Sequence, residues 1–247
     1  MHCPKGLVGS NPTSGIKMCG RYTLTDPDPR RLRMRFDLPE ETEFNERPRF
    51  NIAPTSEVLA VREVNEESSA KGIREAGSLR WGLIPAFADP DDFDRLLINA
   101  RSETVASKPF FADAFRTGRC LIVADGFYEW KKTGTGKKPF FFSLPGRELF
   151  AFAGISAAAS RADGELVHSC SLLTCEPSEV VAEVHKRMPV ILEPDAEEIW
   201  LHPDTPEADL LDLFRPLSGL EAREVSESVN SSRNEGPELL EGPMNLF

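Results

Sequence analysis

Cys19, which follows Met18 and precedes Gly20, has the residue type and the position for an uncommon covalent chemistry. A chain that starts at Met18 and loses this Met, or that loses a longer leader, presents Cys19 as its amino terminus. Its α-amine, with a pKa of about 7.7–8.0, is then partly neutral at pH 7, and an aldehyde can condense with it to an imine. The adjacent thiol can close a five-membered thiazolidine ring, a step that proximity favours. The alternative is a small buried Cys at the start of a strand.

A polar segment from Asn99 to Glu103 follows an apolar run and offers groups for hydrogen bonding and phosphate binding. Asn99 can both donate and accept hydrogen bonds, and Arg101 can hold a phosphate through two parallel N–H donors. The alternative is an Asx turn with a surface salt bridge between Arg101 and Glu103.

Glu129 and His185 are the candidates for proton transfer. Because Glu129 stands between Tyr128 and Trp130, we expect it to be poorly solvated, with its pKa raised toward the range useful for acid and base catalysis. An ordinary Glu at a strand end is the alternative. His185 is expected near the end of a helix that starts at Ser178. An imidazole with an ordinary pKa near 6.5 suits a proton donor, and the alternative is a His that only complements the helix dipole.

Metal and cofactor motifs are weak in this sequence. His168 and Cys170 share one face if their segment is a strand, but with Cys175 they still lack a fourth ligand and a Cys-x-x-Cys pair. The chain has no Walker loop, no G-x-G-x-x-G and no G-x-S-x-G motif. We therefore expect no metal and no cofactor.

The elements that must position these residues are mostly short strands. Apolar runs predict strands over Val58–Val64, Leu79–Ile84, Leu96–Ile98, Cys120–Ala124, Phe140–Leu144, Leu149–Ile155 and Val167–Thr174. Helices are expected over Arg30–Leu38, Pro109–Thr117 and Ser178–Arg187, and a hairpin loop over Glu66–Gly77. Strands and helices do not alternate regularly, which favours one α+β domain on a curved, mainly antiparallel sheet. Leucines in the tail after Glu221 are expected to pack back on the body.

The charge distribution limits the partners. A net charge of −11 argues against a protein that coats nucleic acid by charge alone, so any DNA contact must come from a local basic groove. Eight carboxylates and no Lys or Arg lie between Glu193 and Asp212, a stretch expected to be solvated and far from any phosphate. Solvated surface charge is the preferred interpretation of two basic clusters, Arg30, Arg31, Arg33 and Arg35, and Lys131, Lys132, Lys137 and Lys138.

The first 17 residues are rich in Gly, Pro, Ser and Asn, so we expect a disordered leader or a misassigned start over 1–17 and a folded domain over 18–247. They lack the apolar segment of a signal peptide, and the longest apolar stretch, Leu149 to Ala159, is too short to span a bilayer. Five cysteines form an odd, sparse set, which indicates a reducing cytoplasm. We expect a monomer with no membrane contact.

Seven blocks in order resemble the SOS response-associated peptidase family. They are MCGRYTL at 18–24, FNIAPT at 50–55, LRWGLIPAF at 79–87, INARSET at 98–104, DGFYEW at 125–130, HKRMPVIL at 185–192 and VN…RNEGPELL at 229–240. The resemblance implies a single barrel-like domain flanked by helices, with a positively charged cleft for single-stranded DNA. It also implies that the amino-terminal Cys19 forms a thiazolidine with the ring-opened sugar of an abasic site, and that members remove residues ahead of this Cys autocatalytically.

The resemblance also assigns roles. Asn99 would orient the Cys19 amine, Glu129 would shuttle protons for imine formation and crosslink reversal, and His185 would protonate the sugar ring oxygen. Phosphate contacts would come from Arg101, with Arg21 and Arg187 as weaker candidates, and Trp81 and Pro54 would wedge or stack against bases. Such a protein would lie in the cytoplasm and on the nucleoid when bound to DNA.

Two other functions remain open. A cysteine peptidase acting on other proteins through Cys19 and His185 does not need a free α-amine. A non-catalytic module for single-stranded DNA would form salt-labile complexes and ignore abasic sites.

Overall fold

The computed structural model describes residues 20–64 and 72–242, and its centre is a closed barrel. Five strands form the ring: β3 (Glu57–Val64), β4 (Ile73–Trp81), β6 (Arg119–Ala124), β9 (Phe150–Ser160) and β10 (Leu166–Cys175). Strand β3 pairs with β4 and β6, β6 with β9, and β9 with β10, all antiparallel. A parallel contact between β10 and β4 closes the ring, so these five strands leave no long open edge.

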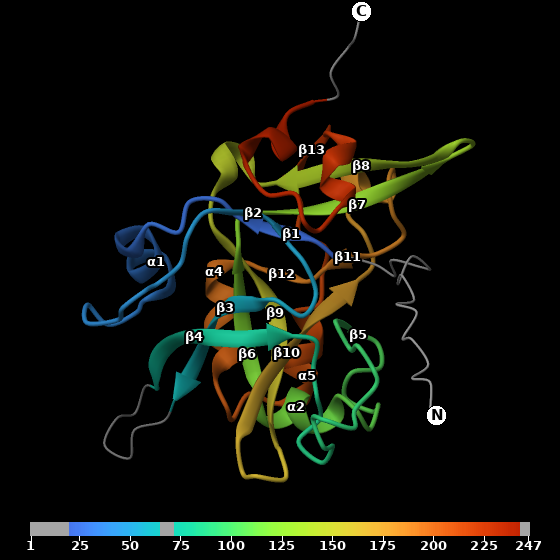
Figure 1. Ribbon diagram of the computed structural model, residues 1–247. Coiled ribbons are helices and arrows are strands. Elements are labelled where there is room, and N and C mark those ends of the chain that lie inside the picture. The colour runs from blue at the N-terminus through green and yellow to red at the C-terminus, as the bar shows by residue number, and fades with distance from the viewer. Residues whose placement is uncertain (1–19, 65–71, 243–247) are drawn as a thin grey trace, which may run out of the picture.

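A second sheet lies across one end of this barrel (Figure 1). Its order is β13 (Glu221–Glu224), β8 (Gly136–Ser143), β7 (Gly126–Thr133), β1 (Tyr22–Leu24) and β2 (Arg49–Ile52), with antiparallel pairing throughout. The edge strand β13 comes from the tail of the chain, and Leu239 and Leu240 are buried. The expected packing of the tail leucines is therefore confirmed for these two, whereas Leu246 lies outside the described residues.

Three short strands add to the barrel, two of them beside β10 and one beside β9. Strand β5 (Asn99–Arg101) pairs in parallel with β10, and β11 (Met188–Pro189) pairs antiparallel with the end of β10. Strand β12 (Ile191–Leu192) pairs with β9. Thr174 of β10 therefore faces Arg101 on one side and Pro189 on the other.

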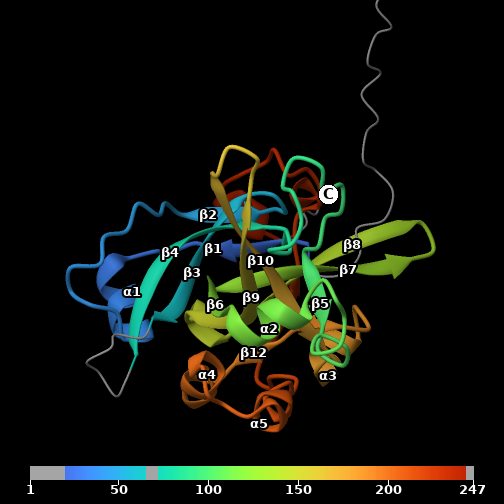
Figure 2. The same cartoon turned by 90° about the horizontal axis from the view of Figure 1, so that it is seen from below.

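Helices cover the outside of the barrel (Figures 1 and 2). In the described ranges they are α1 (Pro29–Phe36), α2 (Ala112–Thr117), α3 (Glu179–Ala182), α4 (Pro194–Leu201) and α5 (Glu207–Asp212), with short 3-10 turns at Pro145–Arg147, Glu227–Asn230 and Pro237–Leu240. All six residues of β6 are buried, because both of its faces are covered, and Trp200 of α4 donates from Nε1 to the Cys120 carbonyl at 3.0 Å. The expected class, one α+β domain on a curved and mainly antiparallel sheet, is confirmed.

Several expected elements differ from those observed. The helix expected over Ser178–Arg187 ends at Ala182, so His185 lies in the segment after it. Asn99 to Arg101 form strand β5 themselves and do not follow a strand. A loop was expected over 66–77, but residues 73–77 belong to β4. Of the remainder, Gly72 is described and residues 66–71 lie outside the described residues. No strand was expected over β7, because its first five residues are all buried and their sequence does not alternate between apolar and polar.

The acidic stretch from Glu193 to Asp212 was expected to be solvated, and this is wrong for Glu197. Its side chain is 1% exposed and accepts two hydrogen bonds from Arg35 of α1, at 2.6 and 2.9 Å. Burial raises the pKa of Glu197, and the Arg35 guanidinium opposes that change. The pair therefore joins α1 to α4 at a position where neither charge is well hydrated.

Replacing Arg35 with Ala is expected to lower the free energy of unfolding by about 3 kcal/mol, because a buried carboxylate loses its partner. Arg31→Ala on the same helix is the matched control, since Arg31 forms an exposed ion pair with Asp26 whose loss costs about 0–1 kcal/mol. Urea unfolding of both variants measures the difference. Equal losses in the two variants would contradict a buried, stabilising pair.

Candidate active site

Glu129 lies on β7 and faces the core together with Phe127, two residues before it. Glu129 is 3% exposed, and its Oε1 lies 3.7 Å from Nδ1 of His185. A carboxylate and an imidazole, two groups that can transfer protons, thus meet at the junction of the second sheet and the segment before β11.

The burial of Glu129 does not come from its neighbours in sequence. Tyr128 and Trp130 point to the opposite face of β7, because side chains alternate along a strand. There they pack with Phe141 in a separate small core, and their polar atoms are hydrogen-bonded: Tyr128 to the Phe50 carbonyl at 2.8 Å and Trp130 to the Asn230 side chain at 2.6 Å. The expected reason for the burial is therefore wrong, while the burial itself is confirmed.

His185 is held by the backbone around it. Its N–H donates to the Val181 carbonyl at 2.8 Å. Its ring Nδ1 lies 3.1 Å from the Arg187 carbonyl and 3.3 Å from the Arg187 backbone nitrogen, so either tautomer finds a partner there. Its side chain is 27% exposed, which leaves the imidazole accessible from solvent.

Asn99 and Arg101 reach the same region from β5. Parallel pairing with Leu172 and Thr174 of β10 fixes their backbone, and Asn99 is half-buried whereas Arg101 is exposed. Figures 1 and 2 both place β5 and β7 on the same side of the barrel. An exposed guanidinium on the same side of the barrel as the buried Glu129 and the half-buried His185 is suited to binding a phosphate.

Arg187 is 9% exposed and is engaged inside the protein. Its guanidinium forms a two-point ion pair with Glu103 and donates to the Thr174 carbonyl at 2.6 Å. These hydrogen bonds raise the pKa of Arg187 and lower that of Glu103. The direct ion pair of Glu103 is therefore with Arg187, and the charge of Arg101 acts on this carboxylate more weakly than that of Arg187.

Arg21 is also 9% exposed, on the first described stretch of the chain. It donates to Oδ1 of Asn51 at 3.0 Å and to the Val229 carbonyl at 2.9 Å, and burial lowers its pKa. These contacts join three of the sequence blocks, which places Arg21 in the internal framework. A phosphate contact by Arg21 stays a prediction.

Strand β1 leads the amino-terminal end of the described chain to Glu129. Tyr22 pairs with Phe127, and the Tyr128 N–H donates to the Arg21 carbonyl at 3.0 Å. Asp125 fastens this strand through hydrogen bonds to the Thr23 hydroxyl at 2.5 Å and to the Thr25 backbone N–H at 2.6 Å. In this antiparallel register the next residue back, Gly20, runs toward Glu129. Cys19 itself lies outside the described residues.

The two residues proposed to contact bases lie side by side in the backbone. The turn after Pro54 is bonded to Trp81: the Thr55 N–H donates to the Trp81 carbonyl at 2.7 Å. The Trp81 side chain is 1% exposed and donates from Nε1 to the Ile98 carbonyl at 2.9 Å, just before Asn99. Stacking needs an open ring face, so base contact by Trp81 stays a prediction, and Pro54 is half-buried.

The three described cysteines are buried free thiols. Burial raises the pKa of Cys120 to about 12 and that of Cys175 to about 11, and it raises that of Cys170 well above its ordinary value. A thiol that stays protonated at pH 7 is a poor nucleophile. Within the described ranges no three or more His, Cys, Asp or Glu side chains gather as a metal site would need, and no helix there has the length and apolarity to cross a membrane.

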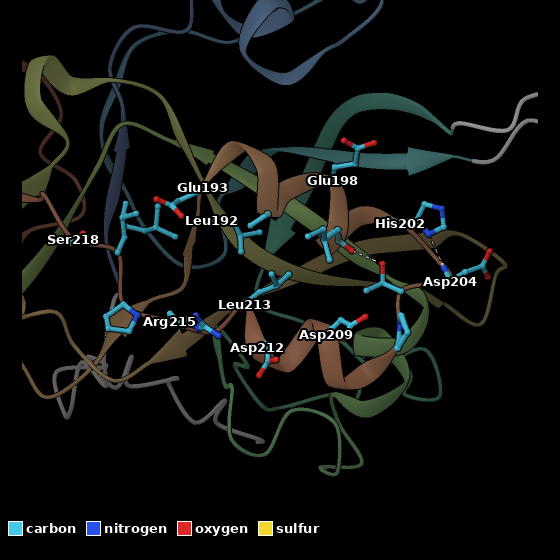
Figure 3. Close-up of a pocket in the computed structure, with 17 residues that line it drawn as sticks. Leu192, Glu193, Glu198, His202, Asp204, Asp209, Asp212, Leu213, Arg215 and Ser218 are labelled. Atoms are coloured by element: carbon cyan, nitrogen blue, oxygen red, sulfur yellow. Dashed lines mark hydrogen bonds between the residues drawn. The ribbon is translucent and has the colours of Figure 1, made fainter.

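A pocket of about 920 Å³ between α4 and α5 is a separate feature (Figure 3). Its lining holds the carboxylates Glu193, Glu198, Asp204, Asp209 and Asp212, against His202 and Arg215. Negative charge around a hollow repels phosphate. This pocket is therefore unsuited to DNA, and the absence of phosphate contacts from this stretch stays a prediction.

Sequence reasoning missed three supporting residues. Glu103 holds Arg187, Asp125 fastens β1, and Asn51 ties Arg21 to the tail by donating to the Ser231 and Asn234 carbonyls, each at 2.9 Å. All three stand inside the blocks INARSET, DGFYEW and FNIAPT. Their signal was present, but a polar residue in a block does not reveal whether it supports the site or reacts in it.

Comparisons with known proteins identify the family and support the fold. The family model of the SOS response associated peptidase (SRAP) matches residues 18–232. The chain is 38% identical over 231 residues to the abasic site processing protein YoqW of Bacillus subtilis, covering 91% of this chain and 99% of YoqW. It is 34% identical to the abasic site processing protein HMCES of Gallus gallus, covering 78% of this chain and 66% of HMCES. A solved structure of a protein from Bacteroides thetaiotaomicron has the same fold, with a TM-score of 0.79 at 21% identity over 91% of this chain and 99% of that one. The chain belongs to the SOS response-associated peptidase family.

Proposed function

We propose that this protein processes abasic sites by forming a covalent crosslink to single-stranded DNA through Cys19. The observation that carries the proposal is the register of β1 on β7, which aims the amino-terminal end of the described chain at Glu129, 3.7 Å from His185. Covalent geometry keeps the Cα atom of Cys19 about 3.8 Å from that of Gly20. Under this proposal, the α-amine and thiol of Cys19 lie next to this pair of proton-transfer groups.

The reaction needs these groups in a fixed order. The ring-opened sugar of an abasic site carries an aldehyde, and the neutral α-amine of Cys19 adds to it and loses water to give an imine. The thiol then adds to the imine carbon and closes the thiazolidine. Glu129 moves protons during addition and water loss, His185 protonates the sugar ring oxygen as the ring opens, and Asn99 orients the amine.

DNA binding is assigned to cations around this group. Arg101, exposed on β5, holds a phosphate beside the lesion, with Arg21 and Arg187 in lesser roles because both are engaged internally. Pro54 and Trp81 are proposed to wedge beside the flanking bases. We also propose that residues ahead of Cys19 are removed by the protein itself, that crosslink reversal gives lyase character, and that it works as a cytoplasmic monomer.

The rival functions lack comparable support. A peptidase acting on other proteins needs a thiol activated by His185, whereas among the described residues the imidazole lies next to the Glu129 carboxylate. A passive DNA-binding module has no need of a buried carboxylate beside an imidazole. Both rivals predict that an aldehyde in the DNA makes no difference.

The test incubates the purified protein with a single-stranded oligonucleotide that carries one abasic site and then resolves it on a denaturing gel. We expect a slow band that survives denaturant. Two matched controls are the undamaged oligonucleotide and the abasic one reduced with borohydride, in which the aldehyde has become an alcohol. A band of equal yield with the reduced oligonucleotide would contradict the proposal.

A further inference from the structure

The hairpin of β7 and β8 carries four lysines opposite one another across its two strands. Lys131 faces Lys138 and Lys132 faces Lys137, on either side of the turn at Gly134 and Thr135. We call these four residues the lysine ladder. The hairpin projects from the body of the protein (Figure 1), and three of the four are exposed, whereas Lys131 is half-buried.

Such an arrangement is unfavourable for the isolated fold. Like charges directly opposite each other on antiparallel strands destabilise the pair. Within the described residues a single ladder member, Lys138, has a salt bridge, to Glu224 of β13 at 2.8 Å. Among the described residues, the other three lysines form no salt bridge, so positive charge is concentrated at the hairpin of a protein whose net charge is −11. A polyanion is the partner that would relieve this repulsion.

The ladder also continues directly from the candidate active site. Lys131 is two residues after Glu129 and lies on the same face of β7, as does Lys138 across from it. A strand rises about 3.3 Å per residue, so the ladder begins about 7 Å from Glu129 along β7. Phosphates a few nucleotides from a lesion held at Glu129 come within reach of long lysine side chains.

We propose that the lysine ladder is an arm that binds the phosphate backbone of the DNA flanking the abasic site. This inference rests on the proposed function for the identity of the DNA. It also names a local basic surface, which a protein with a negative net charge needs in order to bind DNA. The ladder binds without reading bases, since an ammonium group recognises a phosphate as a point charge.

The test measures salt dependence. A variant with all four ladder lysines changed to Gln is compared with the wild-type chain by fluorescence anisotropy on an undamaged single-stranded oligonucleotide over a series of KCl concentrations. Each phosphate contact in a single strand contributes about 0.7 to the slope of log K against log salt. We expect the slope to become shallower by about 1.4 or more, which corresponds to at least two contacts.

The matched control removes four exposed positive charges elsewhere, in Arg30→Gln, Arg31→Gln, Arg116→Gln and Arg215→Gln. It is expected to change the slope by less than about 0.7. The Tm of the ladder variant is expected to stay close to that of the wild type, because loss of the exposed Lys138–Glu224 pair offsets the relief of cross-strand repulsion. Weaker binding at an unchanged Tm then cannot reflect unfolding. An unchanged slope in the ladder variant, or an equal change in the arginine control, would show that the lysine ladder does not bind the DNA backbone.

The denaturing gel separates this inference from the proposed function. If the wild-type chain crosslinks abasic DNA and the ladder variant keeps the wild-type slope, the proposed function stands and the role of the lysine ladder is wrong. If the chain forms no denaturant-resistant complex but its salt slope depends on the lysine ladder, the ladder binds DNA and the proposed crosslink is wrong.

Discussion

Changing Glu129 to Gln is expected to slow crosslink formation and crosslink exchange about 100-fold while leaving non-covalent DNA binding within twofold. Gln keeps the shape and hydrogen-bonding reach of Glu but cannot take up a proton, and general acid–base catalysis typically contributes about 10²–10⁴ in rate. Removal of the residues ahead of Cys19 is expected to slow as well. Single-turnover gels on abasic oligonucleotide measure the rates, and anisotropy on undamaged oligonucleotide measures binding.

The control separates chemistry from structure. Glu165 also loses a carboxylate in Glu165→Gln, but it is an exposed residue paired with Arg161 in the turn before β10, so all rates should stay at the wild-type value. Urea unfolding of Glu129→Gln should give a midpoint close to that of the wild type. Wild-type rates in Glu129→Gln would remove this residue from the mechanism, whatever its stability.

The sequence predicted the parts of the site better than the reasons for their placement. Glu129 was expected to be buried, but by Tyr128 and Trp130, which instead point away and bond to Phe50 and Asn230. The error came from reading neighbours in sequence as neighbours in space. On a strand the residues two positions away share a face, and a strand was not expected there because both faces of β7 are buried.

Long-range pairings were beyond sequence reasoning for a related cause. Arg101 and Glu103 are close in sequence and were considered as a pair, whereas the partner of Glu103 is Arg187, 84 residues later. Only the parallel pairing of β5 with β10, and of β10 with β11, brings these segments together. A single sequence shows which groups can pair but not which strands stand next to each other.

The strands of the barrel were easier to predict from the sequence. Strands expected over 58–64, 120–124 and 167–174 fall within β3, β6 and β10, because apolar β-branched runs bounded by polar turns are a strong local signal. Closure through β10 and β4 was not derivable from those runs. It depends on parallel contacts at Ser169 and Cys170, where the chain offers no motif.

Replacing Cys19 with Ser is expected to abolish the denaturant-resistant complex, a loss larger than for any other single change. Ser keeps an amino-terminal α-amine and can still form an imine, but its hydroxyl is a far weaker nucleophile than a thiol and the imine hydrolyses during denaturation. Borohydride added before denaturation should trap that imine in Cys19→Ser. Trapped product with Ser, and none with a chain whose leader cannot be removed, would separate the role of the amine from that of the thiol.

The described cysteines provide the matched comparison for this test. Cys120→Ser changes a thiol whose pKa is about 12 and which is wholly buried, so crosslinking should persist at the wild-type yield in every folded molecule. Cys19→Ser should lose the complex at unchanged stability. If Cys19→Ser retained a stable adduct at full yield, the bond to DNA would have to come from another nucleophile, and the alignment of β1 with Glu129 would serve folding alone.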